Sequence, residues 1–208
     1  MFALVNKSDN SIIETYSGRI GITIGENQYP QAIFTLWSEA ERNAIDIYTV
    51  EIDNTNLKNQ EWYINTEMTY SFDGSKVTGS YGDATAKPHA DTKWTQSQID
   101  AGVAPEGADT NTVAFEGLKT VLIRQVKEQT KHELGKTDWY IVRKADAGTA
   151  VPSSITNHRA AVRTKCAEME TAITNAADTP ALQTLYTYTE QEDGSVTRPL
   201  GELPRLED

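Results

Sequence analysis

The first eighty residues alternate short β-prone runs with turn-forming residues. Residues 2–5 and 11–16 are two such runs, and the turn-rich segment 6–10 between them favours a hairpin. Isoleucines then occupy every second position over residues 20–24, which is the period-2 pattern of a half-buried strand. The pattern predicts that a sheet begins at the N-terminal end of the sequence.

A short helix is expected next in the chain. Ser38 and Glu41 have the S-x-x-E spacing of a capping box, in which each side chain satisfies an otherwise unpaired amide at a helix start. We expect this helix to run to about Ile45. Strand character returns over residues 47–52.

An Asp-Gly pair gives the strongest local signal in this half of the chain. Asp73 and Gly74 stand between two β-prone stretches, residues 61–72 and 75–81. Such a pair favours a hairpin with a type I′ turn, because both central residues of that turn need a positive φ. The sequence therefore predicts a hairpin here.

The second half changes to helical periodicity. The first long helix is expected over residues 112–134, with Gly135 as its stop. A second helix is expected after Pro152, capped by Ser153 or Ser154 and ending near residue 177. Its apolar positions recur at three- and four-residue intervals, as in a seam that packs against one partner helix: Ile155, Val162, Cys166, Met169, Ile173 and Ala176. Arg159 stands where that rhythm expects an apolar residue.

The C-terminal part of the chain carries two weaker signals. Asp193-Gly194 lies between β-prone runs and predicts a second hairpin, and residues 199–208 contain two prolines and no period. We therefore predict an α+β fold. Its expected parts are a mostly antiparallel β-rich domain at residues 1–82, a loop-rich linker at 83–111, a helical hairpin at 112–178, and a small β-hairpin with an extended tail at 179–208.

Charge and composition narrow the classes of partner. The formal net charge is −11, which repels phosphate backbones and anionic membranes, so we expect no nucleic-acid and no membrane partner. The densest basic group, Arg159, Arg163 and Lys165, is followed at once by Glu168 and Glu170. No signal peptide and no membrane span is expected from the apolar runs, so synthesis in the cytoplasm is predicted.

Catalytic patterns do not emerge from the reactive residues. His89, His132 and His158 lack metal-chelating spacing, and the single cysteine, Cys166, lies on the apolar seam of the second helix. Glycines 18, 21 and 25 fit no nucleotide-binding loop. We therefore expect no enzyme activity, no catalytic residue, no metal and no cofactor.

Aromatic residues and arginines are the remaining candidates for function. Trp62-Tyr63 and Trp139-Tyr140 are adjacent aromatic pairs, and such residues serve either as sheet packing or as interface residues. Arg159 and Arg163 are four apart and share a helix face, where they contact either carboxylates of a partner or groups of the same chain. The predicted interface residues are Trp62, Tyr63, Trp139, Tyr140, Arg159 and Arg163.

A resemblance enters through the C-terminal half. Thr137-Asp138-Trp139, then Val151-Pro152, and then arginines 159 and 163 on the following helix resemble tail-fibre assembly proteins and tail assembly chaperones of tailed bacteriophages. The resemblance covers roughly residues 112–178. The β-rich stretch at 61–81 departs from it, and the chain is longer than a typical fibre assembly protein. The resemblance implies no catalytic residue.

The resemblance implies a role in a phage tail. We expect a structural protein of the tail, baseplate or fibre-attachment region, located in the virion. Its expected partners are other tail or fibre proteins, and we expect a homo-oligomer or multi-copy assembly. Two alternatives remain open: a chaperone that binds fibre protein transiently, and a glycan-binding receptor module using Trp62, Tyr63 and Tyr70.

Overall fold

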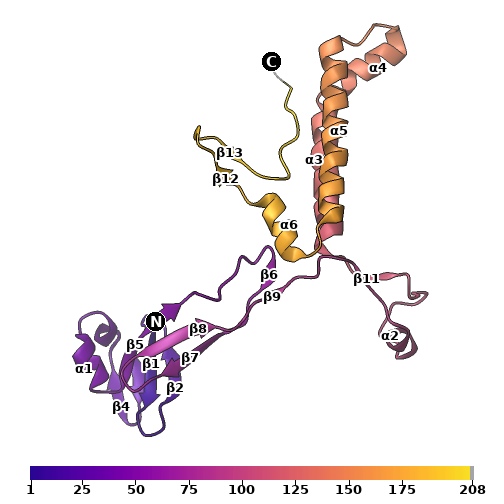
Figure 1. The fold of residues 1–208 in the computed structure, drawn as a ribbon. Helices are drawn as coiled ribbons and strands as arrows, with labels where there is room; N and C mark the ends of the chain where they lie inside the picture. Colours follow the sequence, from indigo (N-terminus) through magenta and orange to yellow (C-terminus); the bar gives the residue numbers. More distant parts are fainter. Residues whose placement is uncertain (207–208) are drawn as a thin grey trace. The chain divides into compact units, whose positions relative to one another are not determined.

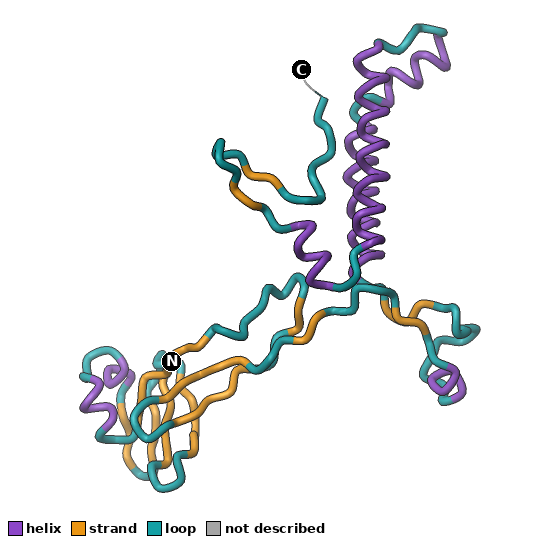
Figure 2. Tube along the Cα trace, viewed as in Figure 1, coloured by secondary structure: helices purple, strands orange, loops and turns teal. Residues whose placement is uncertain are grey.

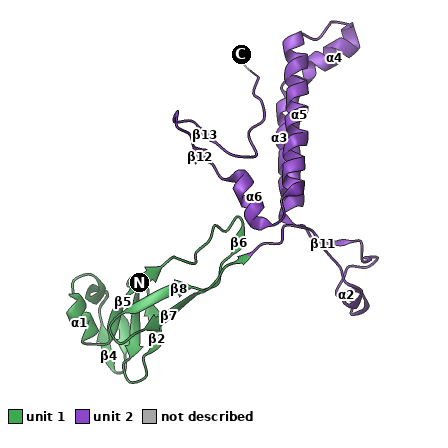
Figure 3. Ribbon diagram, viewed as in Figure 1, with its two compact units in different colours: residues 1–85 green, residues 86–208 purple. Residues whose placement is uncertain are grey.

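The computed structural model describes residues 1–206 of the chain. It divides into two compact units, Met1–Thr85 and a second that starts at Ala86, shown in green and purple in Figure 3. The first unit is β-rich and the second is mostly helical, as Figure 2 shows by colour. The α+β class predicted from the sequence is confirmed. The first unit ends at residue 85, three residues after the predicted boundary.

The first unit is built on a five-stranded sheet (Figure 1). The spatial order is β2-β1-β5-β8-β7, and every neighbouring pair is antiparallel except β5 with β8. The two edge strands, β2 and β7, also contact each other, so the sheet is nearly closed. The strands are β1 (Phe2–Asn6), β2 (Ser11–Tyr16), β5 (Ile47–Asp53), β7 (Met68–Phe72) and β8 (Val77–Tyr81).

Both faces of this sheet carry buried residues, because successive side chains of a strand point to opposite faces. Ala3 and Val5 lie in one core cluster, whereas Leu4 between them lies in the other. The second cluster is covered by short elements that contribute Ile22, Ile33 and Phe34. These elements are β3 (Ile22–Ile24), β4 (Asn27–Tyr29), the 3-10 helix η1 (Gln31–Phe34) and α1 (Glu39–Asn43).

Two turn predictions in this unit have different outcomes. The Ser38 capping box is confirmed, since its hydroxyl accepts from the Glu41 amide and Glu41 accepts from the Ser38 amide. The Asp73-Gly74 hairpin is also confirmed, but its turn is not type I′. Gly74 has φ 96 and Asp73 does not have a positive φ. Instead, the Asp73 carboxylate accepts hydrogen bonds from the amides of Ser75 and Lys76.

The predicted strand at 61–72 is wrong in its first half. Regular β7 begins only at Met68. Trp62 lies in a turn in which its amide donates to the Asn59 carbonyl at 3.1 Å, and its indole is buried. Nearby, short β6 (Tyr63–Ile64) pairs with β9 (Thr85–Ala86).

The predicted linker at 83–111 contains regular structure. Residues 92–115 form an arm in which β10 pairs with β11 and α2 lies between them. The first long helix therefore begins later than predicted, because Val113–Phe115 is a strand paired across the arm. The elements are β10 (Thr92–Lys93), α2 (Gln96–Asp100) and β11 (Val113–Phe115).

The second unit is dominated by two long antiparallel helices, α3 (Leu118–Gly135) and α5 (Ser153–Asn175). Figure 1 shows them side by side. The three-and-four spacing on α5 is confirmed as its buried seam, with Arg159 included in it. The cap prediction is wrong, because Pro152 is the N-cap and it makes no side-chain cap bond. Gly135 is the last residue of α3.

A third helix joins the two long ones. This helix, α4 (Asp138–Ala147), was not predicted. It ends at Gly148, whose φ of 67 is the left-handed conformation that glycine adopts at little cost. The predicted hairpin of two long helices is therefore present, with a third helix at its tip.

The C-terminal segment packs on the long helices. α6 (Thr179–Tyr186), also not predicted, follows α5, and the predicted hairpin is confirmed as β12 (Thr189–Glu190) with β13 (Val196–Thr197). Leu200 is buried, so the start of the predicted extended tail is held by the chain itself. No helix of residues 1–206 has the length and apolarity that a membrane crossing needs.

Candidate functional site

The candidate site is the tip of the helical hairpin, where α3 ends and α4 begins. Arg159 of α5 is 8% exposed there. Its Nη1 donates to the Leu134 carbonyl at 2.7 Å and to Thr137 Oγ1 at 2.7 Å. The same nitrogen lies 2.9 Å from Asp138 Oδ1. One guanidinium therefore joins the end of α3, the connecting residue and the first residue of α4.

These contacts compensate the burial of a charge. The last carbonyls of a helix have no partner within the helix and carry partial negative charge, so a cation there is stabilising. Leu134 supplies such a carbonyl at the end of α3. Asp138 lies in the first turn of α4, where the partial positive charge of a helix N-terminus stabilises a carboxylate. Because Arg159 engages both, its position in the seam fixes where α4 starts.

The anchored helix displays apolar side chains to solvent. No residue of α4 is buried, although Trp139 is 57% and Val142 65% exposed. The Arg143 guanidinium stacks over the rings of Trp139, at 4.9 Å, and Tyr140, at 5.9 Å. We call Trp139, Tyr140, Ile141, Val142 and Arg143 the tip surface. Exposed aromatic and arginine side chains of this kind are those that contribute most to protein interfaces.

A polar layer lies below the tip, between α3 and α5. The Glu133 side chain is 9% and the His158 side chain 7% exposed, and their Oε1 and Nε2 atoms lie 3.4 Å apart. Lys136 also donates to the Glu133 carboxylate. This hydrogen bond is the largest of the effects that hold the pKa of Glu133 below its ordinary value, against the opposing effect of burial. The tip half of the hairpin thus adds charges and hydrogen bonds to the apolar packing of Ile155 and Val162.

The six predicted interface residues are divided between the two units. Trp139 and Tyr140 lie on the tip surface, and Arg159 lies directly beneath it. Arg163 is exposed one turn further along α5, and it donates to the Arg159 carbonyl at 3.3 Å. Trp62 and Tyr63 belong to the first unit.

Two of these residues are not available to a partner in the way predicted. Arg159 is buried because its donors satisfy backbone and side-chain oxygens of its own chain, so the intramolecular interpretation is correct for it. Trp62 is 3% exposed, so its ring cannot stack on a partner or a sugar. Tyr63 is half-buried in β6.

Sequence reasoning missed Ile141, Val142 and Arg143 as interface candidates. Helix α4 carries apolar and aromatic residues on more than one side, so no one-sided period marks it. Its boundaries were nevertheless readable. Asp138 stands in the first turn and Gly148 just after the last, which are ordinary start and stop signals of a helix.

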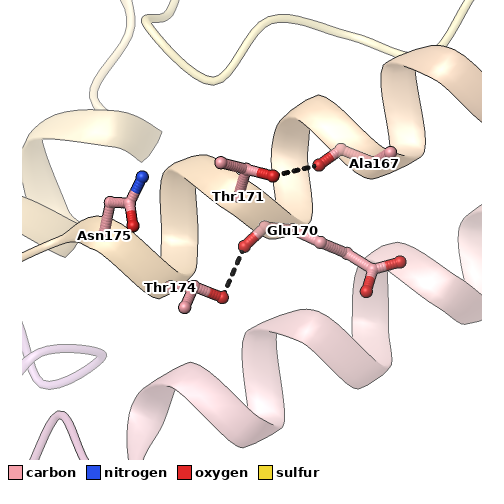
Figure 4. Close-up of a pocket in the computed structure, with 5 residues that line it drawn as sticks. All are labelled: Ala167, Glu170, Thr171, Thr174 and Asn175. Atoms are coloured by element: carbon pink, nitrogen blue, oxygen red, sulfur yellow. Dashed lines mark hydrogen bonds between the residues drawn. The ribbon is translucent and has the colours of Figure 1, made fainter.

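A shallow hollow on α5 is a poor candidate for a ligand site. It is lined by Ala167, Glu170, Thr171, Thr174 and Asn175 (Figure 4). The two threonine hydroxyls donate to carbonyls of their own helix, Thr171 to Ala167 at 2.8 Å and Thr174 to Glu170 at 2.7 Å. These donors are used within the helix, so they do not converge on the hollow.

The seam also contains the single cysteine. Cys166 is buried, as predicted, and burial raises the pKa of its thiol. A raised pKa lowers the fraction of nucleophilic thiolate at neutral pH. Within residues 1–206, no three His, Cys, Asp or Glu side chains are grouped so that they could hold a metal ion.

Comparison with protein-family models, with curated proteins and with solved structures finds no match to this chain.

Proposed function

We propose that this chain is a non-enzymatic structural protein of the tail, baseplate or fibre-attachment region of a tailed bacteriophage. It acts through protein surfaces. The observation that carries this proposal is the tip surface: α4 is fixed by a buried arginine and yet buries none of its own residues. A helix held this firmly with its apolar side chains in solvent is typical of a surface that a partner covers.

The sequence resemblance supplies the phage context of the proposal. Its most specific residues, Thr137, Asp138 and Trp139, meet at the tip, where the first two bind Arg159 and the third is exposed. In the Thr137-Asp138-Trp139 element, the contacts of the first two residues with Arg159 therefore fix the position of the exposed Trp139. A tail or fibre protein could therefore cover the tip surface. Its apolar side chains would contact the exposed apolar residues of α4, and its carboxylates would face Arg143.

Two measurements test the proposal. Mass spectrometry of density-purified particles is expected to detect the protein in multiple copies. A benzophenone amino acid placed at position 142 is expected to cross-link to a tail or fibre protein in those particles. The same residue at position 36, where the exposed Leu36 lies in the first unit, serves as the control site. Absence from particles, together with no cross-linked partner in infected cells, would refute the proposal.

The chaperone alternative predicts a different pattern in the same experiment. A transient chaperone cross-links to fibre protein from position 142 during assembly but is missing from mature particles. The glycan-binding alternative is not favoured, because Trp62 is buried and Tyr63 and Tyr70 are only half-exposed. Glycan binding that is lost on Tyr70→Ala, with unchanged thermal stability, would revive it.

A further inference from the structure

The arm formed by residues 92–115 has no hydrophobic core. No residue within it is buried, although it carries several large apolar side chains. Phe115 is 69% and Val103 64% exposed, and Val113 is exposed as well. The ring centroids of Trp94 and Phe115 lie 6.3 Å apart, which makes an aromatic contact across the two strands of the arm.

The arm has more regular structure than its burial accounts for. Thr95 and Gln98 form a complete capping box at the start of α2. The Asp109 carboxylate accepts hydrogen bonds from the amides of Asn111 and Thr112 and so closes the turn before β11. An isolated two-stranded hairpin is at best marginally stable in water. A well-formed hairpin with exposed aromatic residues therefore needs further apolar surface to cover it.

Charge indicates which surface of the chain the arm complements. The arm carries three acidic residues and one basic residue: Asp100, Glu106, Asp109 and Lys93. The tip half of the helical hairpin, residues 128–163, is the opposite, with six basic and four acidic residues in a chain of net charge −11. Both regions also expose apolar side chains. Apolar surface with opposite charge at its margins is the pattern of two patches that bind each other.

The arm and the tip surface of one chain lie at opposite ends of α3 (Figure 1). The arm is held at the start of α3, where Leu118 and Lys119 donate to the carbonyls of Pro88 and His89. The tip follows the end of this helix of 18 residues, a length of about 27 Å at 1.5 Å per residue. The two patches of one chain are thus separated, and only two copies can bring an arm to a tip.

We infer that the arm of one copy packs on the tip surface of a second copy. The two patches are different surfaces, so the contact is heterologous and each new copy still offers a free arm or a free tip. Such a contact builds rings or filaments. This inference goes beyond the proposed function, since it concerns self-association of the purified chain and requires no phage component.

The test uses sedimentation velocity of the full chain over a concentration series. The wild-type protein is expected to form species larger than a dimer, and added salt is expected to weaken them. An arm variant, Val113→Ser with Phe115→Ser, and a tip variant, Trp139→Ser with Val142→Ser, are each expected to weaken association by about tenfold or more. The control variant, Ile20→Ser with Leu36→Ser, removes exposed apolar side chains of the first unit and is expected to associate like the wild type.

Mixing the arm variant with the tip variant distinguishes an arm-to-tip contact from arm-to-arm or tip-to-tip contacts. The arm variant keeps an intact tip and the tip variant keeps an intact arm, so their mixture is expected to form dimers and nothing larger. Circular dichroism checks that both variants remain folded. A monomeric wild type, full association by either variant, or failure of the mixture to pair would overturn the inference. If the chain is monomeric but present in phage particles, the inference fails and the proposed function stands. If the chain associates but is absent from particles, the inference stands and the proposed function fails.

Discussion

The two ends of the α3–α5 hairpin are held together by different chemistry. At the base, Leu122 and Val126 of α3 and Met169 and Ile173 of α5 are buried apolar residues. Toward the tip, the buried positions of α3 and its connection to α4 become polar, namely Thr130, Glu133 and Thr137, and on α5 the buried Arg159 lies between the apolar Ile155 and Val162. Burial of apolar surface stabilises without direction, whereas a buried guanidinium needs specific acceptors. The comparison suggests that the base supplies stability and the tip supplies position.

The largest expected effect is at the base. Ile173→Ala removes a fully buried side chain and leaves a cavity, so we expect the free energy of unfolding to fall by about 2–5 kcal/mol. Urea denaturation measures it. Thr171→Ala, on the exposed side of the same helix, is the control and should change the stability by about 0.5 kcal/mol or less. An equal loss in both variants would mean that the base seam is not the stabilising element.

A smaller loss of stability but a larger local effect is expected at the tip. Arg159→Met removes the charged donor shared by the Leu134 carbonyl and the Thr137 hydroxyl, although that carbonyl still accepts from Thr137, and we expect a cost of about 1–3 kcal/mol. Asp138 is largely exposed, so water compensates it and the cost stays below that of a fully buried ion pair.

Hydrogen exchange distinguishes position from stability in that variant. Amides of α4 are expected to lose protection in Arg159→Met, while amides around Leu122 and Ile173 keep theirs. Arg163→Met removes a neighbouring exposed arginine and serves as the control, with little change anywhere. Uniform loss of protection along the whole hairpin would contradict the division between base and tip.

The smallest effect concerns pH. The pKa of Glu133 is lowered in the folded chain, chiefly by the hydrogen bond from Lys136. A lowered pKa contributes stability that is present above the ordinary value of 4.5 and is lost as the pH falls through the lowered folded value. His158 also faces this carboxylate. Acidification from pH 6 toward 3 should therefore loosen the tip before the base.

A substitution isolates the contribution of Glu133. Glu133→Gln is expected to cost about 0.5–1 kcal/mol at pH 7, because Lys136 is half-exposed and the ion pair is partly screened. The difference from the wild type should vanish at low pH, where the wild-type carboxyl is protonated. The exposed Glu128→Gln is the control. Urea denaturation at each pH measures the difference in free energy of unfolding. If this difference stays the same down to pH 3, the charge of Glu133 does not contribute to stability.

Local patterns were enough to predict much of the fold. The seam of α5 follows from its three-and-four spacing, and the capping box at Ser38 is a contact between residues three apart. Asp-Gly pairs located both hairpins, because a turn is encoded by adjacent residues. The turn type at Asp73 was wrong, since its carboxylate binds the amides of Ser75 and Lys76 and a longer turn results.

Long-range partners account for what the sequence did not predict. Arg159 breaks the apolar rhythm of its helix visibly, but its acceptor Thr137 is 22 residues away and no spacing reveals it. Val113–Phe115 has helix-compatible spacing with the residues that follow, yet it pairs with β10 across the arm. Trp62 and Trp139 are each followed by a tyrosine, yet Trp62 is buried in a turn and Trp139 is exposed on α4, a difference that the tertiary structure decides.

The two ends of the arm lie side by side where it joins the rest of the second unit. Thr92 pairs with Phe115, and the Asp91 carboxylate accepts a hydrogen bond from the Gly117 amide at 2.7 Å. A side chain at Gly117 would collide with the backbone of Ala90, so this junction tolerates no bulk. The start of α3 is therefore held by Pro88, His89 and Asp91, which lie outside the arm. A chain with residues 92–115 replaced by a short loop would therefore keep the contacts of this junction.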